Sequence, residues 1–503
     1  MLAGSGQARA EWLKAESPRF HVYSSGSEAE LREYVEQLET MESLLRALHG
    51  LNMREAPPRR LEIYLARNLR EMQRVRPSAE ETLGGFYAAG PDIIFAITNQ
   101  NRERNVRASV RDDKDYVVLH EYVHHFMMQH FPFAYSSWVV EGYAEYFMTA
   151  RFEKDAVLVG HPMRATASGA RDMPLSRLLT ESPWNLDTPE LREAFYAQSW
   201  LLTHYLISDA SRRNMLRAYL KDVAEGADSV PAMEKATGMT LAQMQGELRG
   251  YRLPITRYPT TSIPRGETVI TRLPRAADDL LLESVRLRWY SDRAKDEDLL
   301  RTIRTRAARH ADDDFSRLIL ARAEIRMGDR GTGEQLLQDV LSRETNNVEA
   351  LQLMAASRME RAKDDEETST ELNAEARSYL ARAYAADPNH FPTLVSIARN
   401  SGGRTMPAPD NAAEAYLAAL EIAPQVIPLR FETAAMLFGR GQTDYGAHVL
   451  EPLLNTPHSP QTARAARALL ESARAGGPLG STPEDEPGDE DPAEDAEPAA
   501  GGR

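Results

Sequence analysis

The chain has 503 residues, a formal net charge of −15 and no cysteine. This length exceeds what one hydrophobic core usually serves, so two or three domains are expected. Without cysteine there are no disulfides and no thiol nucleophiles, and a transition-metal site must use histidine and carboxylate ligands. Residues 477–503 carry −8 of the charge and the rest carries −7. This acidic balance argues against nucleic-acid binding. No transmembrane segment is expected, because the sequence contains no apolar run of about 18 residues.

The N-terminus has two interpretations. Ala8-Arg9-Ala10 resembles a signal-peptidase site, but no basic start or apolar stretch precedes it. Residues 1–14 are therefore expected to be either a disordered terminus or the remnant of a signal peptide. The second reading implies a periplasmic or secreted protein, and the first a cytoplasmic one.

Residues 15–253 carry strand patterns first and helical patterns after them, which predicts a domain of the α+β class. Alternating apolar residues mark the strands, and apolar residues at helical spacing mark the helices. The expected strands are Phe20–Ser24, Leu61–Leu65 and a hairpin within Phe86–Ile97, and the expected helices are Glu28–Leu48, Asp115–His130, Ser137–Ala150 and Glu190–Ser208, with helical pattern to about Arg249.

The second half of the chain is predicted to be all-helical. Residues 254–275 are rich in Pro and Thr and are expected to form a linker with one strand-like stretch at 268–272. From residue 276 to 475, helices follow one another, and Pro388, Pro424 and Pro457 end three of them at separations of 36 and 33 residues. This region resembles a degenerate tetratricopeptide array, whose concave face could bind a substrate or a protein partner. Residues 476–503 are too rich in Pro, Gly and acidic residues for a core, which predicts a disordered tail.

A candidate metal site lies in the segment His120-Glu-Tyr-Val-His124. Histidines four residues apart share one face of a helix, and zinc accepts two imidazole nitrogens placed in this way. Glu121 points about 100° further round the helix, where its carboxylate can act as a base without ligating the metal. The helix is largely apolar, and buried histidines need partners, which a metal would supply. The alternative is a pair of histidines hydrogen-bonded to backbone or carboxylate groups.

Residues 137–147 read SWVVEGYAEYF, and here the chain resembles the gluzincin metallopeptidases. Aminopeptidase-N-like gluzincins carry a W-x-x-E-G segment after HExxH, and its Glu ligates zinc. The resemblance covers roughly residues 15–250 and implies a zincin-like domain with one Zn²⁺ ion held by His120, His124 and Glu141. Glu145 falls where thermolysin-like enzymes place a carboxylate that orients a zinc-bound histidine; the alternative is a solvated carboxylate on the helix surface. The chain looks most like compact bacterial gluzincin-like proteins, in which tetratricopeptide repeats often follow this domain.

A second segment, Tyr196-Ala-Gln-Ser-Trp-Leu-Leu-Thr-His-Tyr-Leu206, is similar to a helix of the aminopeptidase-N-like enzymes. The first Tyr of that helix donates a hydrogen bond to the oxyanion, so the resemblance implies this role for Tyr196. Ser199 stands where the family has Gly, and His204 is a second candidate for the same task. The alternative is an aromatic core stripe made with Phe195, Trp200 and Tyr205.

One family feature is missing. Aminopeptidase-N-like enzymes carry a strand with a G-x-M-E-N segment before the zinc helix, and its Glu holds the free amino group of the substrate. Residues 84–97 contain no Glu, which argues against aminopeptidase specificity. The strand itself can still bind an extended peptide by pairing along its edge.

Two functions follow. The first is zinc-dependent hydrolysis of a peptide or protein substrate, with Glu121 as the general base and Tyr196 as the oxyanion donor. The second is a non-catalytic helical-repeat scaffold whose N-terminal domain keeps zinc for structure only. The presence of Glu121 beside a complete set of three ligands favours the first, because a structural site usually closes with a fourth protein ligand.

Overall fold

The computed structural model describes residues 12–80, 83–99, 114–162, 173–264, 266–289, 297–402, 407–457 and 459–479, with side chains of the helix at 114–130 described from Val117 onward. Residues 1–11 and 480–503, which make up most of the two predicted disordered termini, lie outside this part of the chain. The described chain starts with Trp12, whose side chain is buried, and with a strand that begins at Leu13. Residues 12–14, three residues of the predicted terminus, therefore belong to the folded domain.

The centre of the molecule is a six-stranded mixed sheet with the order β4-β5-β3-β2-β1-β9. β2 (Phe20–Ser24), β3 (Leu61–Ala66) and β5 (Ile94–Asn99) are parallel, with Val22 beside Ile63 and Ile63 beside Ala96. β4 (Gly85–Ala89) runs antiparallel to β5 at one edge, and β1 (Leu13–Glu16) and β9 (Val269–Arg272) are antiparallel at the other. The predicted hairpin is thus the pair β4–β5.

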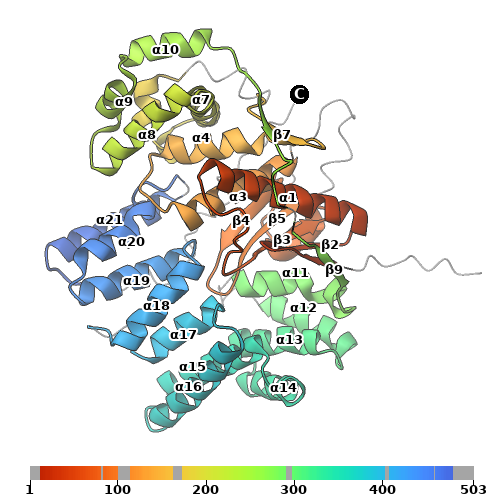
Figure 1. Cartoon of the computed structure of the whole chain (residues 1–503). Coiled ribbons are helices and arrows are strands. Elements are labelled where there is room, and N and C mark those ends of the chain that lie inside the picture. Colours follow the sequence, from red (N-terminus) through yellow and green to blue (C-terminus); the bar gives the residue numbers. More distant parts are fainter. Residues whose placement is uncertain are drawn as a thin grey trace, which may run out of the picture.

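Helices cover both faces of the sheet, because successive strand residues point to opposite sides (Figure 1). Val22 and Ile63 belong to one core cluster with α1 (Glu28–Leu48) and α3 (Lys114–His130). Tyr64 and Phe95 belong to a second cluster with α2 (Leu69–Val75) and α11 (Ala276–Trp289). The sheet is therefore a middle layer, with α3 on the face opposite to α11.

A helical group lies beyond α3. α4 (Ser137–Met148) packs against α3 and against α7 (Pro189–Ile207). The remaining elements are α6 (Leu175–Thr180), α8 (Ala210–Ala224), α9 (Ser229–Thr237), α10 (Leu241–Gly250) and a small sheet of β6 (Arg151–Phe152), β7 (Ala156–Val159) and β8 (Thr256–Pro259). Figure 1 shows these helices above the central sheet.

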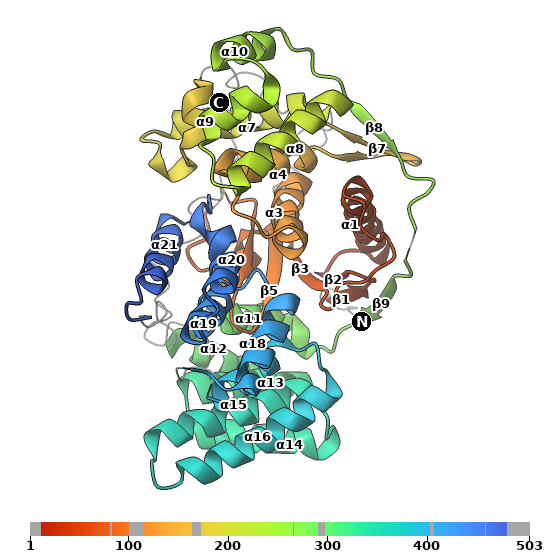
Figure 2. The same cartoon turned by 60° about the vertical axis from the view of Figure 1, so that its left-hand side comes forward.

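The segment predicted to be a linker connects the two sheets. Figure 2 shows the chain running from α10 through β8 to β9 along one side of the molecule. β8 pairs with β7, and β9 pairs with β1, so that Ile270 lies beside Ala15. This segment is therefore tied at both ends to the domain that precedes it.

The described part of the C-terminal region is all-helical, as the sequence predicts, and its helices lie in consecutive pairs. The two helices of each pair pack on each other, and the pairs begin at residues 314, 348, 391 and 427. Figure 2 shows the helices wrapping around the lower side of the sheet. No helix in the described ranges is both long and apolar enough to cross a membrane. The elements are α12 (Glu297–Ala307), α13 (Asp314–Met327), α14 (Arg330–Arg343), α15 (Val348–Asp364), α16 (Ser369–Ala386), α17 (Phe391–Asn400), α18 (Asp410–Ile422), α19 (Ile427–Gly439), α20 (Thr443–Leu454) and α21 (Pro460–Arg474).

The mixed α+β class is confirmed, and several elements have the predicted bounds. β2 and α1 match residue for residue, and α3, α4 and α7 differ by at most two residues at either end. Four strands, β1, β6, β7 and β8, have no counterpart among the predicted elements, and each is only two to four residues long. Strands this short hold too few alternating residues to produce a pattern of their own.

A largely buried ion pair, with side chains 13% and 22% exposed, joins the sheet to α11. Glu62 on β3 accepts two hydrogen bonds from Arg288, at 3.1 and 3.2 Å, and a third from the Tyr64 hydroxyl at 2.6 Å. Arg59 lies 3.9 Å away. Burial alone would raise the pKa of the Glu62 carboxyl, but the two guanidinium groups outweigh it and lower the pKa to about 2.

We predict that Glu62→Gln lowers the free energy of unfolding at pH 7 by about 3 kcal/mol, because two buried cations lose their carboxylate. The folded-state pKa is below the ordinary value of 4.5, so this stabilisation is complete above pH 4.5 and is lost as the pH falls toward 2. Denaturant unfolding followed by circular dichroism at pH 7, 4 and 3 should therefore show the difference from wild type shrinking. Glu28→Gln, at an exposed pair with Arg32, is the control and should cost no more than about 0.5 kcal/mol. A difference that stays constant down to pH 3 would contradict this assignment.

Candidate metal centre

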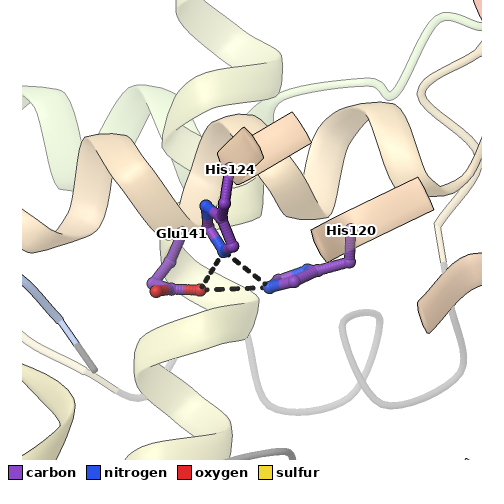
Figure 3. A group of neighbouring side chains, drawn as sticks. All are labelled: His120, His124 and Glu141. Carbon is purple, nitrogen blue, oxygen red and sulfur yellow. Dashed lines mark hydrogen bonds and ion pairs between the residues drawn. The ribbon is translucent and has the colours of Figure 1, made fainter. Parts of the chain in front are cut away.

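The structure brings His120, His124 and Glu141 together (Figure 3). The two histidines extend from one face of α3, and Glu141 extends from the first half of α4. Nε2 of His120 lies 3.0 Å from Nε2 of His124, and Oε2 of Glu141 lies 3.3 Å from the first nitrogen and 3.6 Å from the second. Glu141 is completely buried, and the histidine side chains are 14% and 11% exposed. Three atoms of metal-ligand type therefore lie together where the carboxylate is buried and the two imidazoles are slightly exposed.

These three distances fit one zinc ion. With metal–ligand bonds of about 2.0–2.1 Å, two ligands of a tetrahedral ion are about 3.3 Å apart. The observed separations of 3.0, 3.3 and 3.6 Å lie around this value. Two imidazoles and one carboxylate are also the ligand types of known catalytic zinc sites. The cluster can thus supply three corners of a tetrahedron and leave the fourth open.

Glu145 lies behind His120 rather than on the helix surface. Its Oε1 is 3.4 Å from Nδ1 of His120, and its side chain is 3% exposed. A carboxylate at Nδ1 keeps the proton on that nitrogen, so Nε2 is the nitrogen that would give its lone pair to a bound metal. Burial disfavours the charged form of His120, but hydrogen bonds to Glu141 and Glu145 outweigh it and hold the pKa of His120 well above its usual value. For His124 burial prevails, and its pKa is lowered.

Gly142 lets α4 approach α7 closely next to Glu141. A Cβ atom at position 142 would lie 2.3 Å from Oγ1 of Thr203 and 2.4 Å from the carbonyl oxygen of Ser199. Tyr196 is one turn before Ser199 and therefore lies on the same face of α7, the face toward α4. It is 8% exposed. The structure thus places the predicted oxyanion donor on the helix that packs directly against the Glu141 helix.

Glu121, the predicted base, occupies a half-buried position on α3 toward the edge strand β4. The charge of Glu121 acts on Tyr87 of β4. Burial is the main cause that raises the pKa of the Tyr87 hydroxyl, and the Glu121 carboxylate raises this pKa further. The hydroxyl of Tyr87 is also 2.9 Å from Nδ1 of His125. β4 and α3 are therefore in direct contact on the side of α3 that carries Glu121.

Tyr87 is not among the site residues predicted from the sequence. The available signal was the alternation of β4: Phe86 belongs to the core on the α11 face, so its neighbour Tyr87 must point to the α3 face. Nothing local indicated that its partner is His125. Contacts between residues 38 positions apart depend on how the strand and helix pack.

The other histidines near the site have partners of their own. His204 is completely buried on α7, with Nδ1 2.9 Å from the Tyr251 hydroxyl and Nε2 3.2 Å from the Gly160 carbonyl oxygen. Burial lowers its pKa to about 4. His125 stacks on Tyr122 as well as contacting Tyr87, and burial lowers its pKa to about 3. Both rings have packing partners outside the three-ligand cluster.

Comparisons with protein-family models, with curated proteins and with solved structures find no match to this chain. The chemistry of the cluster is therefore inferred from its ligand types, distances and burial.

We predict that Gly142→Ala destabilises the protein by about 1–3 kcal/mol, because the added methyl group would overlap Thr203 and Ser199. The shift of α4 should also move Glu141 and reduce the zinc bound per chain, measured by atomic emission after dialysis. Gly246→Ala is the matched control. It lies within α10 with no atom near the new Cβ, and should leave zinc content unchanged and raise stability by up to about 1 kcal/mol. A Gly142→Ala variant with wild-type stability and zinc content would disprove the close-packing role.

Proposed function

We propose that the protein is a zinc-dependent peptidase with a zincin-like N-terminal domain and a tetratricopeptide-like C-terminal region. The observation that carries this proposal is the spacing of 3.0, 3.3 and 3.6 Å among the three ligand atoms, with Glu121 adjacent in sequence to one of the ligands. A two-histidine, one-carboxylate set leaves a coordination position open, which a catalytic site requires and a structural site does not.

A zinc ion bound there would supply Lewis acidity, lowering the pKa of a bound water and polarising the scissile carbonyl group. Glu121 accepts the proton of the attacking water and passes it to the amine that leaves when the C–N bond breaks. The Tyr196 hydroxyl donates a hydrogen bond to the oxygen that gains negative charge during the attack. Glu145 holds the orientation of His120 throughout.

The substrate would be an extended peptide. Among the described strands β4 lies at the edge of the central sheet, and its backbone pairs on one side with β5. An extended chain can add to such an edge through main-chain hydrogen bonds. Since Tyr87 of β4 touches α3 next to His124, a peptide paired with β4 would run beside the metal helix.

We predict different effects for the metal ligands and for the base. His120→Ala should lose zinc, because two remaining ligands do not hold the ion at nanomolar free metal. Glu121→Gln should keep one zinc per chain and lower kcat for a mixed peptide library by about 100-fold or more, because the proton acceptor is lost. Zinc content and product formation by mass spectrometry test both.

Two results would contradict the proposal. Wild-type chain with full zinc occupancy and no cleavage of a broad library would favour the alternative, a helical-repeat scaffold with structural zinc. Loss of zinc in Glu121→Gln would instead place Glu121 among the ligands.

For Tyr196 we predict that Tyr196→Phe lowers kcat by about 100-fold with little change in KM, because only the transition state carries the charge that the hydroxyl stabilises. Zinc content and thermal midpoint should stay at the wild-type values. Tyr205→Phe is the matched control, since Tyr205 lies on the same helix with the same 8% exposure. Equal kcat values for Tyr196→Phe and wild type would contradict the oxyanion role and indicate that Tyr196 is only part of an aromatic core stripe.

A further inference from the structure

The inner layer of the helical repeats is covered by the N-terminal domain of the same chain. The first helices of the pairs stack on one another in the series α11, α13, α15 and α17. α11 joins the core on one sheet face, and its Trp289 packs on Phe86 and Phe95 with ring centres 5.2 and 5.9 Å apart. Phe391, the first residue of α17, lies 5.6 Å from the guanidinium of Arg59. The surface on which a repeat array would bind a partner is thus occupied by the N-terminal domain of the same chain.

The turn between β4 and β5 provides the central contact. Asp92 in this turn forms an ion pair with Arg322 of α13 at 2.8 Å, and Arg326 lies 3.8 Å away. The side chains of Asp92 and Arg322 are 21% and 6% exposed. Arg322 also pairs with Glu349 of α15 at 3.1 Å. One carboxylate from the sheet therefore completes a charge cluster that belongs to two repeat helices.

The repeats also hold the metal helix. Nε2 of Gln425, in the turn before α19, is 3.4 Å from the carbonyl oxygen of His125 and 3.0 Å from the Gln129 side chain. Arg430 of α19 is buried and donates to Sδ of Met128 at 3.3 Å. Because Tyr87 contacts the ring of His125, this residue is held by the edge strand on its side chain and by the repeats on its backbone.

We propose that the repeat region is a positioning element of the peptidase site, in which Asp92 with Arg322 sets the position of the substrate-pairing strand β4. The array thus belongs to the catalytic unit, and its inner face binds this chain's own β4–β5 turn instead of a separate protein. The substrate part of this inference rests on the proposed function, whereas the placement of β4 does not.

The test uses Asp92→Asn and Arg322→Gln in the full-length, zinc-loaded protein. Both variants should raise KM for a peptide substrate by about tenfold and keep kcat within about twofold, because the binding strand shifts while the metal and base stay in place. Hydrogen–deuterium exchange of residues 85–89 should become faster. Asp92→Glu should restore most of the affinity, since it returns a carboxylate to the Arg322 cluster.

The matched control is Glu375→Gln, which removes the carboxylate of an ion pair between two repeat helices, with Arg358 at 2.6 Å. It should leave KM and the exchange of residues 85–89 unchanged. Wild-type KM and exchange in both test variants would overturn the inference, and so would faster exchange spread evenly over all helices. Hydrogen–deuterium exchange needs no substrate turnover. A chain that cleaves no peptide would therefore disprove the proposed peptidase activity, while the exchange of residues 85–89 would still test how β4 is positioned.

Discussion

The N-terminal domain is organised around one buried carboxylate. Glu141 has no exposed surface and faces two imidazole nitrogens across the contact between α3 and α4. A carboxylate in such a place is costly unless cations or hydrogen-bond donors neutralise it. α4 packs closely on α7 at Gly142, next to Glu141, and the two histidine side chains keep 14% and 11% of their surface exposed. The same burial that makes the apo cluster unfavourable would make a bound cation favourable.

The reverse side of α3 is fixed by a separate set of charges. The Tyr122 hydroxyl donates to Glu42 of α1, and Glu42 pairs with Arg46 at 2.5 Å and with Arg19 at 3.8 Å. Tyr122 immediately follows Glu121, so the backbone that carries the proposed base is anchored to α1. Because Glu42 and Arg46 are both almost fully buried, rotation of α3 would take the Tyr122 hydroxyl away from a carboxylate inside the core. Such pairs favour one arrangement over others more than they add stability.

The arrangement of layers explains why the two halves of the chain are not independent. The sheet separates α3 from α11, and the helix pairs continue from α11 around the sheet until α18–α21 join the core cluster that contains α3. α3 and β4 therefore each lie against helices of the C-terminal region, although they are far from them in sequence. Movements of the array would reach the site through packed side chains and ion pairs rather than through a flexible linker.

The sequence by itself determined the features that depend on local periodicity. His120 and His124 share a face because a helix repeats every 3.6 residues, and the bounds of β2, α1 and α3 follow from apolar spacing. Glu141 and Glu145 were placed at the site only through the resemblance of residues 137–147 to a known pattern. Tertiary structure alone decided the pairing of Tyr87 with His125, of Asp92 with Arg322, and of β9 with β1. The sequence pattern of each of these segments fits its helix or strand whether or not the contact forms. Only the packing of the complete chain therefore selects these contacts.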